Sequence, residues 1–78
     1  MKLNIKRKVN HDSLWIKAQS VEHKNMFAKL LISRSGVRVT YMDDEMKVVA
    51  NKMIALFEKH SKTNNYGKVL ELIEKELV

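Results

Sequence analysis

The sequence predicts an α+β fold: a small antiparallel sheet of three to four strands, followed by two helices packed on one face. In residues 1–42, apolar and polar side chains alternate, which is the period of a half-buried strand. From residue 43 onward, apolar residues recur every three or four positions, as in an amphipathic helix. The 78 residues include no proline and only two glycines, so we expect one domain, 1–78, without a flexible linker.

A hairpin is predicted at the start of the chain, with a turn-forming segment at residues 10–13 between two alternating stretches. Arg7 interrupts the apolar side of the first stretch, so we expect that strand to end near Arg7 or to lie at a sheet edge. The apolar side of this hairpin consists of Leu3, Ile5, Val9, Leu14, Ile16 and Ala18.

A second hairpin is predicted around Ser35-Gly36, because glycine supplies the positive φ that a tight turn needs. With these two residues as the loop, Arg34 would face Val37 and Ile32 would face Val39. The segment 20–28 before it is polar, and both a short helix and a strand remain open there. One face of the second hairpin would carry Leu30, Ile32, Val37, Val39 and Tyr41, and the other Lys29, Leu31, Ser33, Arg38, Thr40 and Met42.

Two helices are predicted in the second half. The acids at positions 43–45 suit a helix N-terminus, and the helix should run for about 16 to 18 residues to a turn at 63–65. Its expected apolar stripe is Met46, Val49, Ala50, Met53 and Phe57, with Ile54 beside them. The last helix should bury a stripe of Tyr66, Val69, Leu70, Ile73 and Leu77.

The positive charge is concentrated in the predicted sheet. The chain carries a net charge of +6, yet residues 1–42 hold nine basic and two acidic side chains, while 43–78 hold six basic and seven acidic ones. The chain is thus divided into a basic sheet half, 1–42, and a nearly neutral helical half, 43–78. The alternation places most strand lysines on the side that the helices do not cover.

A cationic sheet face with an aromatic residue predicts a nucleic-acid-binding module, because lysines neutralise phosphates and an indole stacks on an unpaired base. DNA and RNA are both open. The alternative is a small regulator or inhibitor, of phage or mobile-element type, whose basic face docks on the acidic surface of a larger protein. The predicted nucleic-acid-binding residues are Lys2, Lys6, Lys8, Trp15, Lys17, Lys29 and Arg38.

Catalytic and metal-binding motifs are not found in the sequence. The chain has no cysteine, its three histidines lack metal-ligand spacing, and the acids at 43–45 lack the spacing of a calcium loop. We therefore expect no enzyme, no cofactor and no metal site. A minimal ribonuclease with His11 or His23 as general base is the remaining catalytic alternative.

The last helix carries more apolar surface than one contact needs, so a homodimer is possible, with Leu72, Leu77 and Val78 at the interface. The alternative is that this arc covers the open end of a small core. No stretch of about 18 apolar residues is present, and the basic N-terminus has no apolar segment behind it. We expect no membrane association and a cytoplasmic protein.

Overall fold

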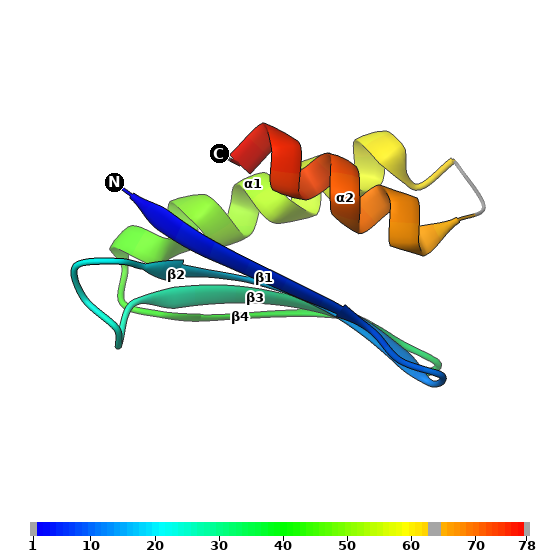
Figure 1. Ribbon diagram of the computed structural model, residues 1–78, viewed down its shortest axis with the longest axis horizontal. Coiled ribbons are helices and arrows are strands. Elements are labelled where there is room, and N and C mark those ends of the chain that lie inside the picture. Colours follow the sequence, from blue (N-terminus) through cyan, green and yellow to red (C-terminus); the bar gives the residue numbers. More distant parts are fainter. Residues whose placement is uncertain (1, 63–64, 78) are drawn as a thin grey trace.

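The computed structural model describes residues 2–62 and 65–77 and has four strands followed by two helices (Figure 1). The strands β1 (Leu3–Val9), β2 (Ser13–Ser20), β3 (Phe27–Ser33) and β4 (Gly36–Met42) form one antiparallel sheet in the order β1-β2-β3-β4. The helices α1 (Glu45–His60) and α2 (Tyr66–Leu77) both cover the same face of this sheet. The predicted α+β fold is confirmed.

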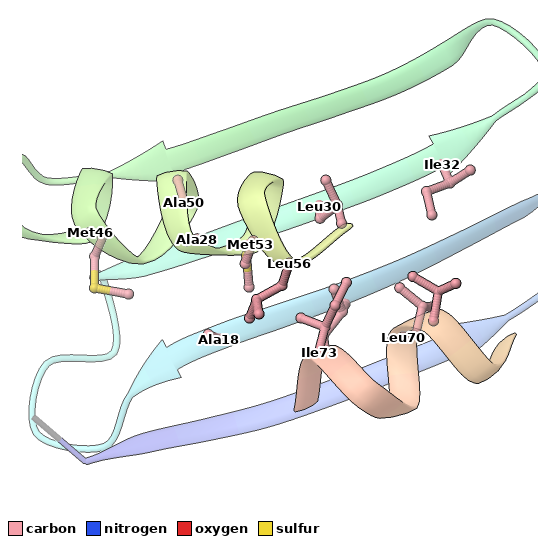
Figure 2. Close-up of a cluster of buried hydrophobic side chains, with 12 residues drawn as sticks. Ala18, Ala28, Leu30, Ile32, Met46, Ala50, Met53, Leu56, Leu70 and Ile73 are labelled. Atoms are coloured by element: carbon pink, nitrogen blue, oxygen red, sulfur yellow. The ribbon is translucent and has the colours of Figure 1, made fainter. Parts of the chain in front are cut away.

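We call the covered face of the sheet the inner face and the opposite one the outer face. α1 packs on β3 and β4, and α2 packs on β2 and β1. Figure 2 shows the core between the two layers, where side chains of the central strands β2 and β3 meet both helices. Its buried residues are Ile16, Ala18, Ala28, Leu30, Ile32, Met46, Ala50, Met53, Leu56, Val69, Leu70 and Ile73.

β1 is an edge strand, as the position of Arg7 predicts, and it continues beyond Arg7 to Val9. Arg7 pairs with Ile16 of β2 and therefore lies on the inner face. Its Nε lies 2.6 Å from Oε2 of Glu74 in α2. A charged residue on the apolar side is thus satisfied by an ion pair at the margin of the core.

The second hairpin has a different register from the predicted one. Its turn residues are Arg34 and Ser35, so Ser33 pairs with Gly36 and Ile32 pairs with Val37. Gly36 follows the turn with a φ of 121°, a conformation that residues with a Cβ rarely adopt. The shift amounts to two residues, so every side chain stays on its predicted face.

The segment 20–28, which the sequence left open, divides into three parts. Ser20 ends β2, a loop follows, and β3 begins at Phe27. Ser20 is buried, and its Oγ accepts a hydrogen bond from the backbone N–H of His23 at 3.1 Å. Ser20 therefore organises a loop and not a helix.

The predicted start and end of α1 are close to the observed ones. Asp43 has a φ of 80°, and its Oδ1 accepts a hydrogen bond from the N–H of Glu45 at 3.3 Å. The stripe of α1 differs in one respect, because Leu56 is buried whereas Ile54 is 37% exposed. Of the turn predicted at 63–65, positions 63 and 64 lie outside the described residues.

In α2, the central stripe is as predicted, with Val69, Leu70 and Ile73 buried. Tyr66 was expected to be buried in this stripe, but it is 44% exposed. It lies in the first turn of α2, where its ring centroid is 6.0 Å from that of Phe57 in α1. The two rings therefore close the loop end of the helical layer. Neither described helix is both long and apolar enough to cross a membrane.

Candidate nucleic-acid interface

The register places the outer-face residues in rows that run across the sheet. In the middle row, Lys6 pairs with Lys17, and Lys17 pairs with Lys29. Three lysines from three adjacent strands therefore stand side by side on the uncovered face. Like charges directly opposite each other destabilise a sheet, so this row costs folding free energy unless a ligand neutralises it.

The row beside it combines cations with apolar groups. Lys8 pairs with Trp15, Trp15 with Leu31, and Leu31 with Arg38. The indole thus lies near the centre of the outer face, with a cation at each end of its row. The row on the other side of the lysines contains Asn4, Gln19, Phe27 and Met42.

Two lysines lean over aromatic rings in opposite directions along the strands. Nζ of Lys29 lies 5.0 Å from the centroid of the Trp15 ring, and Nζ of Lys17 lies 4.8 Å from that of Phe27. Cation–π contacts at exposed sites contribute about 0.5–1 kcal/mol each. They separate the two ammonium groups and so offset part of the repulsion in the lysine row.

The sequence analysis assigns Trp15 to the uncovered face as a residue on which a base stacks, and the structure qualifies this assignment. Trp15 lies on the predicted outer face but is half-buried, because Lys29 covers its ring and Leu31 stands next to it. A base that stacks on Trp15 would have to displace the Lys29 ammonium group. That group would then be free to contact a phosphate.

Phe27 is a second aromatic residue on the outer face that the sequence analysis did not assign. It is half-buried at the start of β3 and pairs with Gln19 and Met42. Its position is two residues before Lys29, so extending the alternation of β3 backwards would have placed it on the same face. Because both a helix and a strand were open for segment 20–28, the start of β3 at Phe27 was not predicted.

A hollow of about 390 Å³ lies at the end of the outer face where β1 begins. Nε2 of Gln19 donates a hydrogen bond to the backbone oxygen of Lys24 at 2.6 Å, so two residues of its lining are joined. Amide and ammonium groups in such a hollow can donate to base edges, sugars or phosphates. It is lined by Asn4, Lys6, Gln19, Ser20, Val21 and Lys24.

Six of the seven predicted binding residues belong to strands and share the outer face: Lys6, Lys8, Trp15, Lys17, Lys29 and Arg38. The seventh, Lys2, precedes β1 and is exposed, and its backbone oxygen accepts a hydrogen bond from Val21 at 3.1 Å. Strand pairing therefore brings to one face six residues that lie up to 32 positions apart in the chain.

The residues of the predicted dimer interface lie apart from this surface, on the helical layer. Leu72 and Leu77 are half-buried, and Leu77 packs against the core. Val78 lies outside the described residues. Part of the apolar arc of α2 therefore covers the core, as the alternative reading expects.

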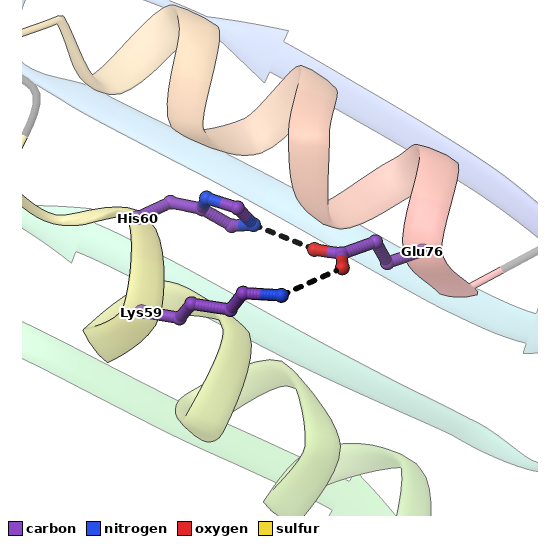
Figure 3. Close-up of polar contacts among 3 residues, drawn as sticks. All are labelled: Lys59, His60 and Glu76. Carbon is purple, nitrogen blue, oxygen red and sulfur yellow. Dashed lines mark hydrogen bonds and ion pairs between the residues drawn. The ribbon is translucent and has the colours of Figure 1, made fainter.

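The histidines lie away from the outer-face rows. His11 is exposed in the turn between β1 and β2, and His23 lies in the loop between β2 and β3. His60, at the end of α1, places Nε2 2.6 Å from Oε2 of Glu76 in α2, as Figure 3 shows. No group of three His, Cys, Asp or Glu side chains that could hold a metal ion occurs in the described part of the chain.

Glu76 also accepts a hydrogen bond from Nζ of Lys59 at 3.1 Å (Figure 3). The hydrogen bonds from His60 and Lys59 favour the ionised carboxylate, so they hold the pKa of Glu76 below its ordinary value. This cluster joins the C-terminal turns of α1 and α2. It is part of the scaffold that supports the sheet.

The chain matches no known protein-family model, no curated protein and no solved structure.

Proposed function

We propose that this protein is a nucleic-acid-binding module whose ligand lies on the outer face of the sheet. The observation that carries the proposal is the row of Lys6, Lys17 and Lys29 on an uncovered face. Phosphates placed over this row relieve the repulsion among the lysines. They also release condensed counterions, which is the main source of affinity for a nucleic acid.

The shape of the face favours a single strand over a duplex. The DNA major groove is about 12 Å wide and admits a helix or a two-stranded ribbon. Adjacent strands are about 4.8 Å apart, so the two edge strands of this sheet lie about 14 Å apart before side chains are counted. The face is therefore too wide to enter the groove, whereas a single strand can lie across it.

The aromatic residues favour a single strand for a second reason. The rings of Trp15 and Phe27 each contact a lysine ammonium group, in two rows that flank the lysine row. Stacking on such rings requires bases that are not already stacked in a duplex, and it contributes roughly 1–3 kcal/mol per base. The proposed ligand is thus a short single-stranded segment with its phosphates near the lysine row and two bases on the rings.

The experiment is a fluorescence-anisotropy titration with labelled DNA and RNA oligonucleotides of about ten nucleotides and with the matching duplexes. We expect tighter binding to the single strands. The logarithm of the affinity should fall linearly with the logarithm of salt concentration between about 50 and 200 mM, with a slope near −0.7 per phosphate contacted.

Two outcomes would count against the proposal in different ways. Absence of binding to every oligonucleotide at low salt would remove the nucleic-acid function and leave an acidic protein surface as the alternative partner. Equal affinity for single strands and duplexes would keep the function but overturn the single-strand assignment.

A further inference from the structure

The two edges of the sheet are protected very differently. β1 carries Lys6, Arg7 and Lys8 within its seven residues. Charged side chains on an edge strand prevent another strand from pairing with it. β4 has one charged residue, Arg38, in a strand of the same length. Its backbone groups and side chains therefore form an edge that is open to pairing.

Apolar side chains are exposed along β4. Val37 is 45% exposed and Tyr41 is 42% exposed, and both lie on the inner-face side, which α1 covers only in part. A groove of about 470 Å³ opens beside them, lined by Val37, Val39, Ile54, Phe57 and Glu58. An unpaired edge strand with apolar residues beside it promotes association.

We propose that β4 pairs antiparallel with β4 of a second copy of this chain, about a twofold axis at Val39. This register matches all seven residues of the strand, because Gly36 then meets Met42 and Val37 meets Tyr41. Each Val37–Tyr41 contact occurs twice, and an aromatic residue opposite a β-branched one is a favourable cross-strand pair. On the outer face, Arg38 meets Thr40, so no like charges oppose each other.

The same operation on β1 is unfavourable. A pairing that matches all seven of its residues places the twofold axis at Lys6, and Lys6 then faces its own copy. Self-pairing is thus specific for the β4 edge and closes after two chains. The twofold pairing also brings Tyr41 of the second copy to Val37, at the mouth of the groove beside Ile54.

This dimer has a defined geometry. Pairing of two β4 strands produces one continuous eight-stranded sheet, because each copy contributes four strands. The helices of both copies then cover the same face, and the two outer faces form one basic surface. The interface differs from the one expected at Leu72, Leu77 and Val78.

The test is the molar mass of the full chain in solution, measured by sedimentation equilibrium over a range of concentrations. We expect a reversible dimer.

Val37→Glu and Tyr41→Lys should each raise the dissociation constant of the dimer by about tenfold or more, since each change disrupts two symmetric pairs. The double variant with both changes should restore the dimer, because opposite charges then face each other twice. Val9→Lys changes an exposed apolar residue on the β1 edge, so it is the matched control and should leave the dimer intact.

A monomer at all concentrations would overturn the proposal, and so would a dimer that both single variants leave unchanged. Circular dichroism identifies a variant that fails to fold. In that case Val39→Cys provides the test, because the wild-type chain contains no cysteine. The single thiol should form an intermolecular disulfide on mild oxidation if Val39 lies at the twofold axis, and failure to cross-link would contradict the register.

Discussion

At the scale of single residues, Trp15 and Ile16 are neighbours in β2 with opposite environments. Ile16 is fully buried in the core, whereas Trp15 is half-buried on the outer face beneath the Lys29 ammonium group. The largest apolar side chain of the strand therefore contributes to the surface and not to the core. In the proposed function, this side chain provides the surface on which a base stacks.

Trp15→Ala should weaken binding of a single-stranded oligonucleotide by roughly 1–3 kcal/mol, because one stacked base is lost. The free energy of unfolding should fall by less than the roughly 2–5 kcal/mol expected for Ile16→Ala, the matched core variant. Anisotropy titrations and urea unfolding measure the two quantities. A large loss of stability together with unchanged affinity would show that Trp15 has a structural role only.

The outer-face residues of β2 and β3 differ in how well strand alternation predicts their surroundings. Alternation alone placed Lys6, Lys17 and Trp15 on one face, because strand parity fixes sidedness without knowledge of the pairing. It did not predict that Lys29 covers the indole, since that contact depends on the register between β2 and β3 and on side-chain rotamers. It missed Phe27 because the start of β3 was not recognised.

At the scale of elements, the burial of α1 differs from the prediction because it depends on where α2 packs. Ile54 and Leu56 lie on opposite flanks of the apolar stripe of α1. The helical period alone does not indicate which of the two flanks is buried. α2 packs beside α1 and buries Leu56, so Ile54 remains exposed next to β4. The side on which α2 returns is a property of the tertiary fold, and the stripe itself contains no information about it.

In the hairpin between β3 and β4, the predicted register is wrong but the predicted faces of the strands are correct. The predicted and observed registers differ by two residues, so Ile32 pairs with Val37 and not with Val39. The apolar faces of both strands agree in either register, and only the turn distinguishes them. The turn begins one residue earlier than predicted, because Gly36 is needed for its positive φ after the turn and not within it.

The contact between α1 and α2 predicts a pH dependence of stability. The folded-state pKa of Glu76 lies below its unfolded value because His60 and Lys59 hydrogen-bond the carboxylate. This contribution is therefore present above the ordinary glutamate pKa of 4.5 and is lost as the pH falls through the lowered folded-state pKa. Glu76→Gln should reduce stability near neutral pH and flatten the acid limb of a plot of unfolding free energy against pH.

Urea unfolding at a series of pH values below neutrality measures this effect. Glu71→Gln removes a carboxylate from the same helix and leaves the pairs of Glu76 intact, so it should retain the contribution of Glu76 to the acid limb. An acid limb of Glu76→Gln that is as steep as that of the wild-type chain would contradict the assignment.

At the scale of the whole molecule, the two layers have different roles. The sheet half carries a net charge of +7 and the helical half −1, so the positive charge belongs to the layer whose outer face is uncovered. The helices contribute the apolar side chains that close the core and mixed charges on their own surface. Lys6, Lys17 and Lys29 stand in one row across adjacent strands of this layer, where like charges repel one another. Lys6 also keeps the β1 edge unpaired, so the binding role proposed for the row has to be tested separately from net charge.

This asymmetry leads to a prediction that compares two variants of equal net charge. Replacing Lys6, Lys17 and Lys29 by Gln, and separately replacing Lys47, Lys52 and Lys75 of the helices by Gln, removes three positive charges in each variant. If phosphates lie over the lysine row, only the first variant should lose affinity for single strands. Its salt slope should become less steep by about 2, because each lost phosphate contact accounts for about 0.7.

The first variant should also unfold at an equal or higher urea concentration than the wild-type chain, since the opposed like charges are gone. The loss of the two cation–π contacts offsets part of this gain in stability. If the first variant binds single strands more weakly but is no less stable, the lysine row serves binding at a cost in folding free energy. Equal losses of affinity in both variants would instead mean that the nucleic acid responds to net charge alone, and the outer face would then have no special role.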